Sequence, residues 1–225
     1  VAERQNAIRL LPKMGGNEFL EELVAEVVSG ELDPALHLDV FETAKDPAFG
    51  DDITIVEPVA ELEADWLAEM AANPLAPFEV ATYGGDPVRG KSVFLNHAAA
   101  QCIRCHKIED GKGSNVGPNL KEIGKKRDAA YLLESLVDPQ RTIAKGYGNI
   151  SLTLTDGSNV AGQFRDEKNG KVFVRDADNK VTQIHLEKIK ERSPVVSTMP
   201  PMGFILTKEE LRDVMAFLMA LRGES

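Results

Sequence analysis

The sequence has no apolar run as long as the ~18 residues that a membrane-spanning helix needs, so we expect no membrane span. Its first residues, Val1-Ala2-Glu3-Arg4, lack the basic and then apolar pattern of a secretory leader. We therefore expect an export signal either to have been removed or never to have belonged to this chain. The composition, 43% hydrophobic, is too apolar for a disordered chain, and 225 residues suffice for one large or two small packed domains.

Basic residues are scarce in the first 86 positions, which hold 4 Lys or Arg against 19 Asp or Glu and so carry a net charge of −15. Residues 87–225 carry a net charge of +5. This contrast predicts two modules that join near Gly84-Gly85-Asp86-Pro87. Nucleic acid is not an expected partner, because the first module lacks clustered cations and the aromatic residues of the second are not interleaved with its positive charge.

Cysteine is limited to Cys102 and Cys105, and His106 follows the second one directly. Two thiols at this spacing can form thioethers with the vinyl groups of one porphyrin, and the histidine then falls under the iron, so the motif is typical of c-type haem attachment. A structural zinc site uses four ligands, and no second cysteine pair is present. A redox dithiol usually follows a strand and needs no histidine there, and a plain disulfide leaves His106 without a role.

A second axial ligand has four candidates: His97, His185, Met199 and Met202. Met199 is favoured because it opens a loop that runs into a capped terminal helix, where a thioether could be held over the ring. Met202 is the next candidate. His185 falls among the apolar residues of a predicted strand, and His97 lies only five residues before Cys102, so we expect structural roles for both histidines.

Apolar periodicity predicts helices in the first part of the chain and strands later. The expected helices cover residues 17–29, a segment capped by Asp33, 61–72, 87–97, 128–136 and a terminal helix with Thr207 and Glu210 as its capping box. The expected strands are 149–155, 159–165, 171–175 and 181–186, which predict a four-stranded antiparallel meander. The first helices resemble one or two units of an α-solenoid, although no repeat period establishes it, and the alternative is a helical cap on the second module.

The contact between the two modules needs more than charge, because salt screens their attraction over roughly 8 Å. We expect apolar contacts by Trp66, Leu67 and Met70 to form the seam. The linker from Asn73 to Pro87 is rich in proline and apolar residues, and we expect it to lie on the second module as an extended arm.

The second module resembles class I cytochromes c. The matching residues are Gly90, Phe94, the segments 102–106 and 117–120, and Met199-Pro200. The resemblance implies that the first and last helices of the module cross, with Gly90 allowing close approach and Phe94 packing on Phe217 or Leu218.

The same resemblance assigns two further roles. It implies that the Pro118 carbonyl accepts a hydrogen bond from the His106 ring, which fixes that ring. It also implies that Met199 is the sixth ligand, since the ligand methionine of small cytochromes of this class lies eight residues before the cap of the last helix, here Thr207.

More narrowly, residues 86–223 resemble a haem-binding domain common in Planctomycetes and Verrucomicrobia. The markers are residues 90–107, 132–139, Gly146-Tyr147 and 197–200. In that family the domain usually ends a chain that contains a dehydrogenase region, which is not present here, and HEAT-like helices. The implied fold class is mainly α: a class I cytochrome c fold over residues 86–225 with a β meander inserted at about 148–190, preceded by a HEAT-like helical segment over residues 1–85.

The expected function is single-electron transfer by one covalently bound haem c, with Cys102, Cys105, His106, Pro118 and Met199 around it. The chain itself is not expected to be an enzyme. Its expected partners are redox proteins, namely a dehydrogenase as donor and a terminal electron acceptor. Cations that could steer an acidic partner are Lys107, Lys112, Lys121, Lys125, Lys126 and Arg127. Because haem attachment takes place outside the cytoplasm, we expect a periplasmic or other extracytoplasmic location. The alternative is a haem enzyme or gas sensor with an open or displaceable sixth site.

Overall fold

Helices make up the first part of the computed structural model, which describes residues 1–108 and 112–223. They are α1 (Ala2–Met14), α2 (Asn17–Ser29), α3 (Pro34–Ala44), the 3-10 helix η1 (Pro47–Phe49) and α4 (Ile53–Glu69). The Asp33 carboxylate accepts the N–H of Ala35, which confirms the expected cap of α3. The apolar faces of these helices meet in one core around Leu36, Phe41 and Ile55.

A second group of helices surrounds a separate core. Its members are η2 (Ala76–Ala81), α5 (Pro87–Asn96), α6 (Cys102–Cys105), α7 (Ile123–Lys126), α8 (Ala129–Val137), η4 (Met202–Phe204) and α9 (Lys208–Ala220). Helices α5 and α9 pack so closely at Gly90 that a side chain there would overlap the carbonyl oxygen of Asp213. The Phe94 and Phe217 rings lie 5.6 Å apart between their centroids. The close approach at Gly90 and the packing of Phe94 are therefore confirmed.

The strands form a five-stranded antiparallel sheet in the order β4-β3-β2-β1-β5. They are β1 (Asn149–Leu154), β2 (Asn159–Lys168), β3 (Lys171–Arg175), β4 (Val181–His185) and β5 (Ile189–Arg192), with the 3-10 helix η3 (Leu186–Lys188) before the last. The first four pair in sequence order, so the predicted meander is confirmed. The prediction missed β5, which returns past η3 and pairs with β1 opposite Leu152 and Thr153.

The expected fold class, a mainly α class I cytochrome c fold with an inserted meander, is wrong. About half of the chain is helical, and the five-stranded sheet makes it a mixed helix and sheet structure that does not match a small, mainly helical fold. The physical reason lies in the alternation of residues 149–189. It places Ile150, Leu152, Val172, Val174 and Ile184 together, where they form a core of their own. The sheet is thus a body with its own packing.

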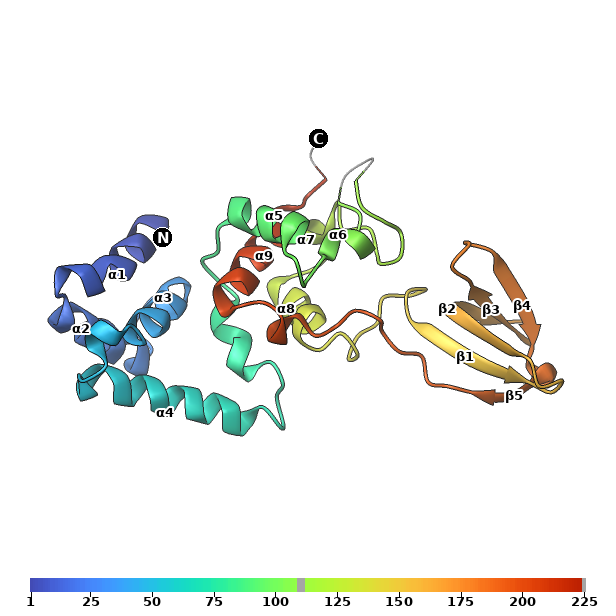
Figure 1. The fold of residues 1–225 in the computed structure, drawn as a ribbon, viewed down its shortest axis with the longest axis horizontal. Helices are drawn as coiled ribbons and strands as arrows, with labels where there is room; N and C mark the ends of the chain where they lie inside the picture. Colours follow the sequence, from blue (N-terminus) through green and yellow to red (C-terminus); the bar gives the residue numbers. More distant parts are fainter. Residues whose placement is uncertain (109–111, 224–225) are drawn as a thin grey trace.

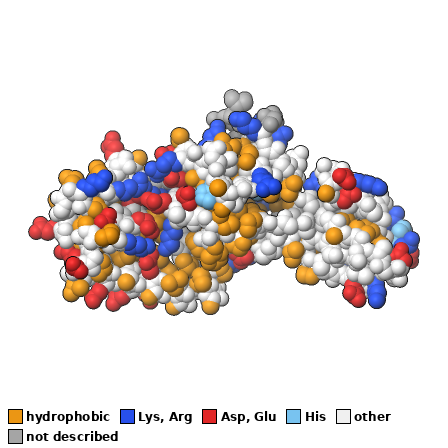
Figure 2. Space-filling model, viewed as in Figure 1, with side chains coloured by type: hydrophobic (Ala, Val, Ile, Leu, Met, Phe, Trp, Pro, Cys, Tyr) orange, Lys and Arg blue, Asp and Glu red, His pale blue; other side chains and the backbone are white. Residues whose placement is uncertain are grey.

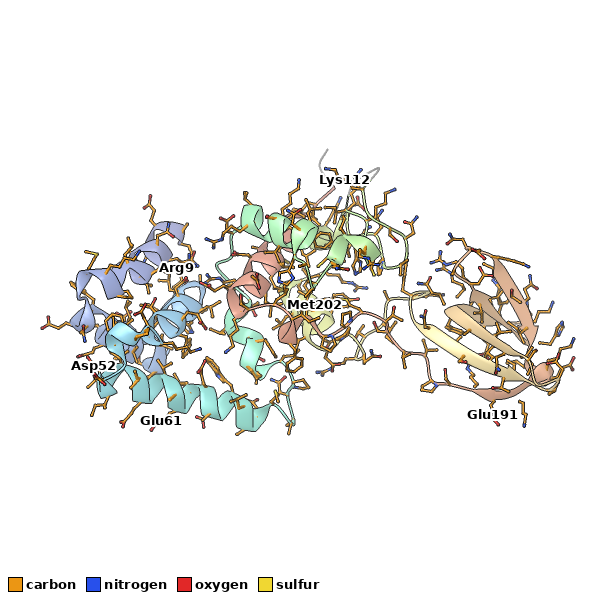
Figure 3. The ribbon with its side chains drawn as sticks, in the orientation of Figure 1. Arg9, Asp52, Glu61, Lys112, Glu191 and Met202 are labelled. Carbon is orange, nitrogen blue, oxygen red and sulfur yellow. The ribbon has the colours of Figure 1, made fainter. Side chains whose placement is uncertain are left out.

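Two arms connect this sheet to the helices, one entering β1 and one leaving β5, and the sheet lies at the end of the molecule away from α1 to α4 (Figure 1). Figure 3 shows the same order, with Asp52 at the start of α4 and Glu191 on β5 at opposite ends and Met202 between them. Within residues 1–108 and 112–223, no helix is both long and apolar enough to cross a bilayer.

The seam between the first helices and α9 is partly apolar, as expected, because Leu38 of α3 is buried in the second core, and it also contains a buried polar pair. Asp39 of α3 and Arg212 of α9 form an ion pair with 2.7 Å between Oδ2 and Nη1, and both side chains are fully buried. Trp66 does reach the seam, because the Lys208 ammonium lies 5.1 Å from its ring centroid. Leu67, in contrast, is 61% exposed. The apolar residues of α4 pack mainly into the core of the first helices.

Candidate functional site

Cys102 and Cys105 occupy the two ends of α6, a helix of one turn. Gln101 begins it in the left-handed region, with a φ of 45°, and the His106 N–H closes it by donating to the Cys102 carbonyl. Both thiols are free; Cys102 is buried and Cys105 is exposed. Burial raises the pKa of the Cys102 thiol to about 11, so this sulfur is protonated at neutral pH.

The His106 ring is fixed by the segment that follows the motif. Its Nδ1–H donates to the Pro118 carbonyl at 2.9 Å, as the resemblance implied. Gly117 packs against the ring so closely that a Cβ there would lie 2.7 Å from Cε1. Burial lowers the pKa of His106, although the bond to Pro118 opposes this shift. The ring is therefore neutral, donates through Nδ1 and leaves Nε2 with a lone pair for a metal.

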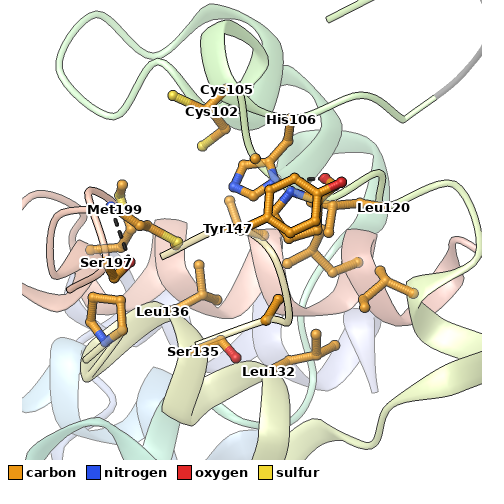
Figure 4. A pocket seen from close by; sticks show the side chains of 18 of the residues that line it. Cys102, Cys105, His106, Leu120, Leu132, Ser135, Leu136, Tyr147, Ser197 and Met199 are labelled. Carbon is orange, nitrogen blue, oxygen red and sulfur yellow. Dashed lines mark hydrogen bonds between the residues drawn. The ribbon is translucent and has the colours of Figure 1, made fainter. Parts of the chain in front are cut away.

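Met199 lies on the opposite wall, across the cavity from His106 (Figure 4). Its N–H donates to the Ser197 hydroxyl at 3.2 Å. Ser197 is in turn bound to Gln140 by two hydrogen bonds of 2.9 Å, one from the Gln140 amide to its carbonyl and one from its N–H to the Gln140 oxygen. These bonds position the loop that carries the thioether.

These walls enclose a cavity of about 580 Å³, within the size range of cofactor sites. Phe94, Leu120, Ile143 and Leu218 line it, and hydrophobic side chains gather over this central part of the molecule (Figure 2). The donor set of two thiols, one neutral imidazole and one thioether around an apolar cavity fits a covalently attached haem.

The other three candidate ligands have different surroundings. Met202 lines the cavity too, but it is only 3% exposed and packs into the core beneath it. His97 uses Nδ1 to accept the N–H groups of Ala99 and Ala100, which confirms its structural role in that turn. His185 is exposed at the end of β4 and does not line the cavity.

Of the six expected cations, Lys126 and Arg127 line the cavity. Lys126 pairs with Glu122 at 2.7 Å, and the Arg127 guanidinium lies 4.3 Å from the Tyr131 ring centroid. The sequence reasoning did not single out Tyr131 as a cavity residue. Tyr131 and Arg127 are four residues apart across the start of α8, and this spacing is the sequence feature that predicts a contact between their side chains.

No described group of three or more His, Cys, Asp or Glu side chains could bind a metal by itself. An iron at His106 would therefore depend on ligands that a porphyrin supplies. No known protein family matches this sequence, and neither does any curated protein.

Proposed function

We propose that this chain binds one haem covalently through Cys102 and Cys105 and transfers single electrons. The observation that supports this most is the cavity itself, which brings both thiols, the oriented His106 ring and the Met199 thioether together around one apolar space. Four residues from two segments of the chain meet there, since Cys102, Cys105 and His106 are neighbours in sequence and Met199 lies 93 residues beyond His106.

When bound, the haem supplies the one-electron Fe(III)/Fe(II) couple. The residues of this chain determine how readily the reduced haem gives up an electron. The Pro118 carbonyl polarises the His106 ring and strengthens it as a donor. A methionine ligand favours the ferrous state and raises the potential. The apolar lining around Phe94 and Leu218 acts in the same direction, because it disfavours the extra positive charge of the ferric state.

The proposed partners are redox proteins: a dehydrogenase that donates electrons and a terminal carrier that accepts them. Lys126 and Arg127 stand at the cavity and carry the charge that attracts an acidic partner surface. The chain performs no bond chemistry on a substrate in this proposal. Because haem attachment requires an export-coupled assembly system, we place the protein outside the cytoplasm.

Expression with and without a cytochrome c maturation system tests the proposal. With the system, we expect a red protein whose haem stays attached in acid acetone, a low-spin spectrum and no binding of carbon monoxide. Cys102→Ser with Cys105→Ser is the matched control and should lose the attached haem. Extractable haem in the unaltered protein contradicts thioether attachment, and carbon monoxide binding contradicts electron transfer in favour of an open sixth site.

A further inference from the structure

The sheet contacts the cavity wall at the segment 114–118. Gln163 on β2 donates through Nε2 to the Val116 carbonyl at 2.6 Å, and Arg175 on β3 donates through Nη2 to the Asn115 carbonyl at 3.3 Å. A second cavity of about 550 Å³ lies between this segment and the sheet, and Val116 lines both cavities. Hydrogen bonds, more than close packing, therefore carry this contact.

Arg175 fixes the orientation of the Gln163 amide. Its Nε donates to the Gln163 Oε1 at 3.1 Å, and its Nη2 donates to the same oxygen. With its oxygen directed at the guanidinium, the amide presents its NH2 group to the Val116 carbonyl. Both residues stand at paired positions of β2 and β3, so the sheet register sets their distance.

The segment that Gln163 contacts is the one that fixes the His106 ring. One residue beyond Val116, the Gly117 N–H donates to the Cys105 carbonyl at 2.6 Å, and the Gly117 backbone packs against the ring. The next residue, Pro118, supplies the carbonyl that the ring N–H bonds. A shift of Val116 therefore passes directly to both contacts of the ring.

We propose that Gln163, oriented by Arg175, is a positioning residue for His106. The sheet thus has a function at the cavity: it fixes the backbone that sets the direction and donor strength of the histidine. The importance of this role for iron ligation rests on the proposed haem function, whereas the positioning of the ring does not.

The variant Gln163→Glu tests this inference sharply. It keeps the oxygen that Arg175 binds and replaces the donor that faces Val116 with a second oxygen. Gln183→Glu is the matched control, because it makes the same chemical change on β4 of the same sheet, where Gln183 accepts from Lys171 at 3.5 Å. Arg175→Lys is a second test variant that keeps the charge and loses the fixed fork of donors.

NMR hydrogen exchange on the isolated protein gives the readout, at the Gly117 amide and at the His106 Nδ1 proton. We expect Gln163→Glu to speed both about tenfold, and Arg175→Lys by less, while amides inside β2 and β3 keep their rates. The Gln183→Glu control should leave all of them unchanged. Unchanged rates at both sites in Gln163→Glu, or equal acceleration throughout β2 and β3, would overturn the proposal. Intact mass reports haem attachment separately, so a protein without haem refutes the proposed function and still tests the positioning role.

Discussion

Asp39 and Arg212 offer the sharpest stability test, because their ion pair joins α3 to α9 across 173 positions of sequence. The two side chains make two hydrogen bonds, of 2.7 and 3.2 Å, and neither is exposed. Arg9 of α1 contacts the same carboxylate at 2.5 Å. Asp39→Asn keeps the size of the side chain but leaves the fully buried Arg212 without its counter-charge, whereas Arg9 keeps Glu209 at 3.7 Å.

The expected loss of unfolding free energy follows from this geometry. Removing one partner of a buried ion pair costs about 3–5 kcal/mol, because the remaining charge is desolvated and uncompensated. With a urea slope of about 3 kcal/mol per molar, the unfolding midpoint falls by roughly 1–2 M. Circular dichroism follows the whole chain. Fluorescence follows Trp66, the only tryptophan, which packs on Phe41 in the core of the first helices.

Two comparisons separate this effect from a general effect of lost charge. Glu63→Gln removes a more exposed carboxylate that contacts Lys45 at 2.7 Å, and it should cost at most about 1 kcal/mol. Asp39→Leu combined with Arg212→Met should recover much of the loss, because apolar side chains can replace a buried ion pair. If Asp39→Asn destabilises the protein no more than Glu63→Gln, the reasoning is refuted.

Local features were the most predictable from the sequence. The capping box of Thr207 and Glu210 is present at the start of α9, and the Asp33 cap begins α3. Such signals depend on residues within one turn of each other, so the sequence displays them directly. The motif Cys102 to His106 belongs to the same class, because the prediction of haem attachment uses only the spacing of neighbouring residues.

Contacts between distant polar residues were not predictable. Asp39 with Arg212, and Gln163 with Val116, join residues that no periodicity relates. The linker shows a different error. It does lie against the second core, but residues 76–81 form a 3-10 helix where an extended arm was expected, because Pro77 suits a first helical turn and Phe78 is buried there.

Three further predictions concern the site and the helix that precedes it. Met199→Ala should open the sixth site and remove the sulfur-to-iron charge-transfer band. Met202→Ala, at a core position, should keep the band and lower the free energy of unfolding in urea by about 2–5 kcal/mol. A band that survives Met199→Ala shows that Met199 is not the sixth ligand. Gly90→Ala forces α5 away from the backbone of α9 and should cost about 1–3 kcal/mol in the same assay, against little change for Lys91→Ala on the exposed face. The last concerns Asp86, whose pKa is lowered because its carboxylate accepts two N–H groups at the start of α5. A lowered folded pKa means that the cap stabilises fully above the unfolded value of about 4 and is lost as the pH falls through the folded value. Asp86→Ala should therefore cost about 1 kcal/mol at pH 7, and this difference should vanish in acid. A difference from the unaltered protein that stays constant down to about pH 2 would show that the carboxylate charge has no part in the cap.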